Sequence, residues 1–243
     1  MAIDVDKQRG ILEGISRHYN VYEGFDRRQN EVVGEMMAER VRGKRTLELG
    51  CANGLITGML LKTAAALDVV DGAGKYIAEV TAKYGPAISA HVSLFEEYDP
   101  PCKYEAVVFA NTLHHIHAPE ALLERIRGWV APGGRLYITA PNMLSLHRRL
   151  GVLMGKLKDT HDATERNLAF DQPGRYTKAS LIAQLERAGY RVVECHGFFL
   201  KPFSHAQMET LDPSPELMKA LCQMGRELEE YASLIFAEAE PLR

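Results

Sequence analysis

The chain has 243 residues, 46% of them hydrophobic and 25% charged, which is the composition of a globular protein with one substantial α/β core. A formal net charge of −3 argues against a general nucleic-acid binder, because such proteins usually carry an excess of basic residues. Four scattered cysteines without a Cys-x-x-Cys pair argue for a reducing compartment and against structural zinc.

An N-terminal lid is expected over residues 1–42, helical and amphipathic over residues 5–42. Its opening residues, Met-Ala-Ile-Asp-Val-Asp-Lys, lack the apolar segment of a secretory signal. Two helical stripes follow, made of Ile11, Ile15 and Tyr19, and then of Val32, Met36, Met37 and Val41. Packing of a helical lid on the core explains most of these positions. His18, Tyr19 and Tyr22 lie near the break between the two helices and could instead close over a ligand. Tyr19 and Tyr22 are the candidate substrate-binding residues among them.

Residues 46–54, Thr-Leu-Glu-Leu-Gly-Cys-Ala-Asn-Gly, join a strand, a tight turn and a helix. Leu47 and Leu49 are typical of a buried strand, with Glu48 at its carboxyl end, and the apolar spacing after the turn predicts a helix. Such a turn brings backbone N–H groups close to a ligand at the N-terminus of the helix. The dinucleotide pattern Gly-x-Gly-x-x-Gly is absent, because neither Gly nor Ala falls at its third place.

An acid directly before a Gly-x-Ala-x-Gly loop resembles motif I of the class I S-adenosylmethionine-dependent methyltransferases. The resemblance implies S-adenosyl-L-methionine as the cofactor. The cofactor-binding residues that it implies in this first motif are Glu48, Gly50, Cys51, Ala52 and Gly54.

A short apolar strand over residues 66–71 ends in Asp71, 23 residues beyond Glu48. This separation is close to that of the acid that binds a ribose in a βαβ unit. In the methyltransferase pattern the matching acid accepts from both ribose hydroxyls, since a carboxylate offers two oxygens to a vicinal diol. A surface-loop aspartate is the alternative, but the strand end and the Gly-Ala-Gly turn that follows favour the functional reading, and Gly72 is placed in the same site.

A third strand is expected over residues 88–92. The resembling family places its adenine contacts directly after this strand, from an acidic or polar side chain and from apolar residues that flank the ring. The candidates here are Leu94, Phe95 and Glu96. Phe95 is equally well explained as a core residue.

Residues 104–111 form a near-continuous apolar run, as expected of a central parallel strand that is buried on both faces. The sequence Thr-Leu-His-His-Ile-His over residues 112–117 looks like the family's Leu-x-His loop, which passes beside the transferable methyl group. Asn111 and Thr112 are therefore candidate cofactor contacts. The resemblance to the family is thus carried by three separate motifs along the chain.

Many members of the family carry Glu where this chain has His114, so the role of that acid is in doubt and an imidazole is available instead. His114 is the candidate general base, and His115 is the candidate for positioning the acceptor. A histidine base would make kcat fall below a pKa near the usual value of about 6.5. The three histidines of this loop could also suggest a metal, but no further ligand at helical spacing supports one.

A helix is predicted over residues 119–130, a sharp Ala-Pro-Gly-Gly turn over 131–134 and a fifth strand over 135–140, an order that is common in the family. The helix should bury one apolar face, which consists of Leu122, Leu123, Ile126, Trp129 and Val130.

Residues 142–158 interrupt the alternation of strands and helices with a helical stripe that consists of Leu146, Leu150, Leu153 and Leu157. Basic residues surround the stripe. Such a charge run is usually a solvated face, but it follows the fifth strand, at the edge where substrates enter. A local basic cluster could bind a phosphate or carboxylate of the acceptor. His147, Arg148 and Arg149 are therefore candidate acceptor contacts, together with Tyr176, and His147 is a third candidate base.

Thr177 is a predicted N-cap of a helix that ends at Gly189, and a strand restarts over residues 190–195. Ser214 precedes a proline at the first position of another helix. Its apolar stripe consists of Leu217, Leu221, Met224, Leu228 and Tyr231, and a last strand is expected over 233–237.

Seven strands alternating with helices predict an α/β fold with a doubly wound, mostly parallel sheet, and the resemblance implies an antiparallel seventh strand. We expect one domain over 1–243. It comprises a helical lid over 1–42, a cofactor-binding half over 43–141 and an acceptor-binding half over 142–243, and the helical insertions build the acceptor pocket.

The activity implied by the resemblance is methyl transfer from S-adenosyl-L-methionine to an oxygen or nitrogen of a small-molecule acceptor, such as an anionic or sugar-type biosynthetic intermediate. The protein mainly has to position the nucleophile in line with the sulfur, and a hydroxyl acceptor also needs a base. One alternative is a non-catalytic subunit with the methyltransferase fold, against which the intact motif argues. The other is a nicotinamide-dependent oxidoreductase, which should show the missing glycine pattern.

No apolar run approaches the roughly 20 residues that a membrane-spanning helix needs. We therefore expect a cytoplasmic protein that binds a small-molecule acceptor, neither nucleic acid nor membrane, and no metal. A monomer or a homodimer is expected.

Overall fold

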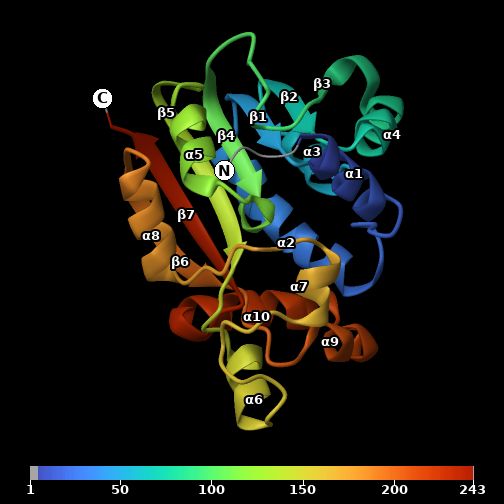
Figure 1. Ribbon diagram of the computed structural model, residues 1–243, viewed down its shortest axis with the longest axis vertical. Helices are drawn as coiled ribbons and strands as arrows, with labels where there is room; N and C mark the ends of the chain where they lie inside the picture. The colour runs from blue at the N-terminus through green and yellow to red at the C-terminus, as the bar shows by residue number, and fades with distance from the viewer. Residues whose placement is uncertain (1–4, 243) are drawn as a thin grey trace. The chain divides into compact units, whose positions relative to one another are not determined.

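A computed structural model describes residues 5–242 (Figure 1). Residues 1–4, predicted to begin the lid, and residue 243, predicted to end the acceptor-binding half, lie outside the described residues. The strands are β1 (Arg45–Leu49), β2 (Ala66–Asp71), β3 (Ser89–Val92), β4 (Tyr104–Ala110), β5 (Val130–Pro141), β6 (Tyr190–Phe198) and β7 (Leu234–Pro241).

The α-helices are α1 (Val5–Ser16), α2 (Gly24–Arg40), α3 (Leu55–Leu60), α4 (Gly74–Tyr84), α5 (Pro119–Arg127), α6 (Leu146–Leu153), α7 (Glu165–Ala169), α8 (Lys178–Arg187), α9 (His205–Leu211) and α10 (Pro215–Glu227). Three short 3₁₀ helices are η1 (Gly85–Ala87), η2 (Leu113–His115) and η3 (Glu229–Tyr231). The helices α7 and α9 were not predicted as separate elements.

The strands form one seven-stranded sheet in the order β3-β2-β1-β4-β5-β7-β6. β1 pairs in parallel with β2 and with β4, and β2 pairs in parallel with β3, whereas β6 and β7 are antiparallel. The predicted fold class, a doubly wound and mostly parallel seven-stranded sheet, is therefore confirmed. The strand order reverses between β1 and β4, and ligands of such sheets bind outside the carboxyl ends of the strands at this reversal.

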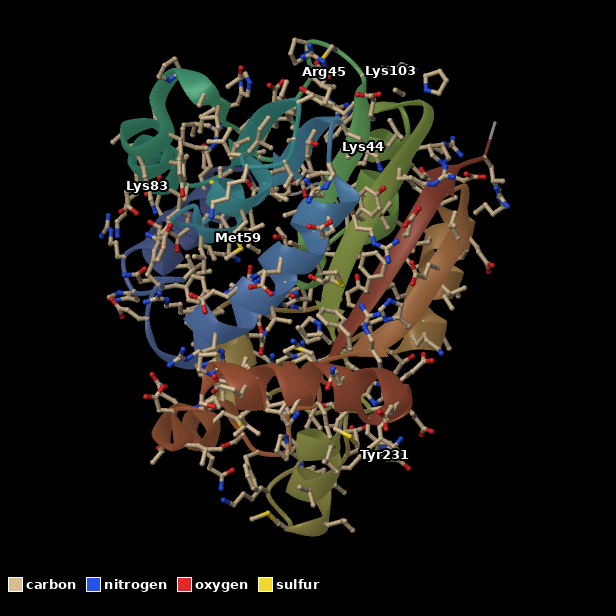
Figure 2. All side chains as sticks on the ribbon, turned by 180° about the vertical axis from the view of Figure 1, so that it is seen from behind. Lys44, Arg45, Met59, Lys83, Lys103 and Tyr231 are labelled. Atoms are coloured by element: carbon tan, nitrogen blue, oxygen red, sulfur yellow. The ribbon has the colours of Figure 1, made fainter. Side chains whose placement is uncertain are left out.

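The chain divides into two compact units. The first comprises Met1–Ala110 and Ala121–Tyr137, and the second comprises Asn111–Glu120 and Ile138–Arg243. In the first unit, α2 packs closely on α3. A Cβ added to Gly34 of α2 would lie 2.3 Å from the sulfur of Met59, which Figure 2 labels beside that helix. In the second unit, α8 and α10 both pack on β6, and α8 lies along it in Figure 1.

The two N-terminal helices predicted over residues 5–42 are confirmed, and α1 lies beside α4 (Figure 1). The backbone N–H of Gly74, at the first position of α4, donates to Oε1 of Glu13 at 2.6 Å. Lys75 Nζ donates to the Ser16 carbonyl at 2.6 Å. A carboxylate at a helix N-terminus is favourable because the helix dipole is positive there, so these contacts tie α1 to the start of α4.

The predicted helix over 119–130 ends earlier, since α5 stops at Arg127 and β5 begins at Val130. The predicted Pro-Gly-Gly turn falls within the bounds of β5. Tyr104 at the start of β4 donates its N–H to the Trp129 carbonyl at 2.9 Å, which draws the chain alongside β4 before the turn. Gly133 has a φ of +79°, as a tight turn requires. Trp129 is buried, so its predicted place in the core is confirmed.

The apolar stripe predicted for α10 exists, but it faces solvent. Leu217 and Met224 are 40% and 39% exposed, whereas Met218 and Gly225 are buried. A Cβ on Gly225 would lie 2.3 Å from the backbone N of Phe199, so the small side of the helix is the side that packs. The predicted stripe of residues 146–157 is only partly buried, because Leu153 is 83% exposed, whereas Leu146, Leu150 and Leu157 are half-buried.

Candidate cofactor and acceptor sites

The loop between β1 and α3 is a tight turn built from small residues. Gly50, Ala52 and Gly54 all have positive φ angles, of 83°, 43° and 82°, which glycine adopts freely and other residues adopt at a cost. A Cβ on Gly54 would lie 2.6 Å from Val80 Cγ1, so the loop also needs a glycine to fit against α4. The loop thus brings backbone N–H groups to the carboxyl end of β1, as the sequence predicted.

The Asp71 carboxylate at the end of β2 binds this loop directly. Its Oδ2 accepts from the N–H groups of Cys51 at 3.0 Å and Ala52 at 3.2 Å, and its Oδ1 accepts from the Ala73 N–H at 2.9 Å. Burial raises the pKa of Asp71 from its usual 3.8 to about 6, against the opposing effect of these three donors. The predicted ribose acid and the predicted loop are therefore brought together in one site.

Glu48 is the second buried acid of the site, with 1% of its surface exposed. Its Oε2 has no hydrogen-bond partner among residues 5–242. Burial raises the pKa of Glu48 to about 8, with a smaller contribution from the nearby Asp71. An unpaired buried carboxyl oxygen is costly and indicates a site that a ligand completes. S-adenosyl-L-methionine carries a ribose diol and an ammonium group, which are hydrogen-bond donors that fit buried carboxyl oxygens.

The predicted adenine contacts lie after β3. Leu94 is buried, and a Cβ on Gly72 would lie 3.0 Å from its Cδ2. Phe95 packs edge-to-face on Phe109 with 5.6 Å between ring centroids, which favours the alternative that Phe95 is a core residue. Glu96 is half-buried.

A cavity of about 650 Å³ in the first unit is lined by His18, Tyr19 and Tyr22, the three residues predicted to close over a ligand. Asn53 of the glycine loop also lines it and accepts from the Val21 N–H at 3.3 Å. Lys83, labelled in Figure 2, donates to the Tyr22 hydroxyl. The remaining lining residues are Arg17, Asn20, Glu23, Lys75 and Glu79.

Most of this lining was not predicted from the sequence. Asn53 could have been predicted from the sequence, because it lies inside the glycine loop between Gly50 and Gly54. The charged residues of α4 carry no local signal, since only folding brings that helix to the N-terminal segment.

In the second unit, the loop after β4 begins at Asn111, which has a φ of +51°. Its N–H donates to the Thr139 carbonyl at 3.1 Å, and the Thr139 hydroxyl donates to the Asn111 side chain at 3.0 Å. Thr112 then precedes η2, which contains both candidate histidines. These hydrogen bonds to Thr139 of β5 hold the start of the loop in place.

His114 is buried, and its Nδ1 has no hydrogen-bond partner in the described part of the chain. Burial lowers its pKa well below the usual value, and the neighbouring His115 lowers it further. The Nδ1 of His115 lies 2.9 Å from the Phe170 carbonyl, and burial lowers the pKa of His115 to about 4. The expected inflection of activity near pH 6.5 is therefore wrong for both residues, because both rings are neutral well below that pH.

The basic segment of α6 is not simply a solvated face. Arg148 is buried and donates from Nε and Nη2 to the carbonyls of Thr160 and Asp162. Arg149 donates to the Leu144 carbonyl at 2.7 Å and forms an ion pair with Glu230 at 2.6 Å. Both guanidinium groups thus bind the chain itself, which favours a structural role.

His147 and Tyr176 are the two remaining predicted acceptor contacts. His147 Nδ1 is buried and has no hydrogen-bond partner in residues 5–242. Tyr176 is buried, which raises its pKa to about 12, and its carbonyl accepts from the Met143 N–H at 2.8 Å. Tyr176 forms an isolated parallel β-bridge with Asn142, so it lies beside the segment just before α6.

Across residues 5–242, no group of three or more His, Cys, Asp and Glu side chains is arranged to hold a metal ion. In the same range, none of the helices combines the length and apolar character needed to cross a lipid bilayer.

Comparison with known proteins places this architecture in a family. The family model of a methyltransferase domain matches residues 22–195. A ubiquinone biosynthesis O-methyltransferase of Xylella fastidiosa is 24% identical over 187 residues, covering 72% of each chain. A probable S-adenosylmethionine-dependent methyltransferase of Mycolicibacterium smegmatis is 25% identical over 172 residues, covering 71% of this chain and 62% of the relative.

Solved structures share the fold at low identity. The DhpI-SAM-HEP complex superposes with a TM-score of 0.63 at 18% identity, covering 99% of this chain and all of the other. The [4+2]-cyclase SpnF superposes with a TM-score of 0.64 at 11% identity, covering 96% of this chain and 93% of SpnF. A cyclase among the neighbours shows that the fold alone does not determine the reaction.

The matched family segment contains β1, the glycine loop, Asp71 and the loop after β4, which are the parts that carried the resemblance. The predicted family, enzyme class and cofactor are thus confirmed. The chain belongs to the methyltransferase-domain family and is an S-adenosyl-L-methionine-dependent methyltransferase.

Proposed function

We propose that this enzyme transfers the methyl group of S-adenosyl-L-methionine to an oxygen of a small-molecule acceptor, with His114 as the general base. The observation that carries the proposal is a buried imidazole whose Nδ1 has no partner among residues 5–242. Relatives named as O-methyltransferases support an oxygen acceptor. An amine acceptor would need no base, only to arrive uncharged.

The first unit supplies cofactor binding. Asp71 would accept a hydrogen bond from the ribose, and the glycine loop would face the cofactor with its backbone N–H groups. Glu48 would offer its unpaired Oε2. The bound cofactor supplies a methyl group that is already electrophilic, because it is attached to a sulfonium. The protein has only to align the acceptor oxygen opposite the sulfur and to exclude water.

His114 accounts for the proton. As the new C–O bond forms and the S–C bond breaks, the acceptor hydroxyl gives its proton to the free Nδ1, and the imidazolium later releases it to water. A lowered pKa keeps the ring in its basic form at neutral pH. His115, fixed by the Phe170 carbonyl with its ring centroid 4.4 Å from that of His114, is a positioning residue.

The test is methyl transfer by His114→Gln, assayed with a panel of phenols, alcohols and amines. We expect kcat on the hydroxyl acceptor to fall about 10²–10⁴-fold, while the Kd of S-adenosyl-L-methionine stays within about twofold. Wild-type kcat should show no fall near pH 6.5, the usual pKa of histidine, because burial lowers the pKa of His114 well below that value.

His117→Gln is the matched control, since His117 lies in the same loop and pairs with Asp171 at 2.9 Å near the surface. Its kcat should stay close to that of the wild type. Methylation of amines but of no hydroxyl acceptor would contradict the proposal. A kcat of His114→Gln on hydroxyl acceptors within a few-fold of the wild-type value would also contradict it.

A further inference from the structure

The N-terminal end of α6 (Figure 1) is incomplete in its hydrogen bonding. Ser145 is the N-cap residue and is fully buried, yet its hydroxyl makes no capping hydrogen bond and has no partner among residues 5–242. An N-cap serine normally accepts from an N–H of the first turn, and a buried unpaired hydroxyl is costly. The hydroxyl and the first N–H groups of the helix are therefore available to a ligand.

A second unpaired buried group lies two residues further along the chain. His147 is the second residue of α6, and its Nδ1 is buried without a partner in the same range. A ring nitrogen can donate a hydrogen bond once protonated, or in the neutral tautomer that carries the proton there. Two independent side chains at one helix end thus lack the partner that burial demands.

Positive charge surrounds the same place. Lys201 is buried, and it lowers the pKa of His147 together with Arg148 and His205, after the larger effect of burial. The groups that shift this pKa by their charge are thus all basic. Arg148 is already bound to the carbonyls of Thr160 and Asp162, so it contributes charge rather than free donors.

We propose that the start of α6, with Ser145, His147 and Lys201, binds an oxyanion, a phosphate or carboxylate group carried by the acceptor. A helix N-terminus attracts anions through its N–H groups and its dipole, and a nearby ammonium group strengthens the hydrogen bonds. The assignment of this anion to the acceptor rests on the proposed function, whereas binding of the oxyanion itself does not. The acceptor would accordingly be an anionic small molecule.

The test is titration of the ¹⁵N-labelled protein with inorganic phosphate and, separately, with acetate, at constant ionic strength set by chloride. We expect saturable shifts of the Leu146 and His147 backbone amides with at least one of the two anions. Ser145→Ala and Lys201→Gln should each weaken this binding about tenfold or more, because each removes a bond to a charged group. Lys219→Gln, an exposed lysine of α10, is the matched control and should bind as the wild type does.

Absence of saturable shifts with both anions would overturn the proposal. A loss of anion affinity in the Lys219→Gln control as large as that of Ser145→Ala and Lys201→Gln would also overturn it. Ser145→Ala keeps the inference testable if Lys201→Gln fails to fold, which circular dichroism would reveal. S-adenosyl-L-methionine affinity is measured on the same samples and should be unchanged. Oxyanion binding without methylation of any hydroxyl acceptor would count against the proposed function alone.

Discussion

Asp71→Asn should weaken cofactor binding by an amount that follows from its hydrogen bonds. A carboxylate offers about four lone-pair sites. The N–H groups of Cys51 and Ala52 occupy Oδ2, to which the Cys51 thiol also donates at 3.8 Å, and the Ala73 N–H occupies one site of Oδ1. About one site, on Oδ1, is left for a ribose hydroxyl without displacing the loop. One hydrogen bond to a charged group contributes about 1.5–3 kcal/mol. The Kd of S-adenosyl-L-methionine should therefore rise about ten- to hundredfold.

The stability of the same variant should depend on pH in a defined direction. Burial raises the pKa of Asp71 from 3.8 to about 6, so the folded state binds the proton more tightly than the unfolded chain. The wild type therefore loses stability as pH rises from about 4 to about 6, by at most about 3 kcal/mol. Asparagine does not ionise. The unfolding free energy of Asp71→Asn relative to wild type should thus increase by up to about 3 kcal/mol from pH 4 to pH 7.

Calorimetric titration with the cofactor and urea unfolding at several pH values measure the two effects separately. Asp68→Asn is the matched control, because Asp68 is a buried acid on the same strand whose carboxylate accepts from the Tyr104 hydroxyl at 2.6 Å. It should alter stability and leave cofactor affinity unchanged. If Asp71→Asn binds the cofactor within twofold of wild type, or no more weakly than Asp68→Asn, the assignment of Asp71 to the ribose is refuted.

Two further variants test other parts of the fold by urea unfolding. Burial raises the pKa of Glu48 to about 8, so the folded state binds this proton more tightly than the unfolded chain. Between about pH 4.5 and pH 8, the unfolding free energy of the wild type should therefore fall by at most about 5 kcal/mol more than that of Glu48→Gln. Parallel profiles of unfolding free energy against pH for the two proteins would contradict this. Gly225→Ala should destabilise by about 1–3 kcal/mol, because its Cβ would lie 2.3 Å from the Phe199 backbone N. Gly14→Ala, in open space on α1, should instead stabilise slightly, and equal effects of the two would refute the packing argument.

The sequence by itself determined the features that local physical chemistry sets. The strands were located to within a few residues at most ends, because buried parallel strands are short apolar runs bounded by turns. Thr177 and Ser214 were recognised as N-caps, and both side chains accept from backbone N–H groups three residues on. The acid, the glycine loop and Asp71 were joined in one site because parallel strands end at one edge of the sheet.

Only the tertiary structure decided which partners each group meets. Periodicity showed that α10 is amphipathic, but Gly225, not the leucine stripe, faces the chain at Phe199, since close backbone approach selects the smallest side chain. Arg148 belongs to a charge run in the sequence, yet folding buries it against two carbonyls. The low pKa of His114 likewise follows from burial among residues distant in sequence. Local spacing fixes helices and strands, whereas burial, pKa and the free hydrogen-bonding groups of the site depend on long-range contacts that no local pattern encodes.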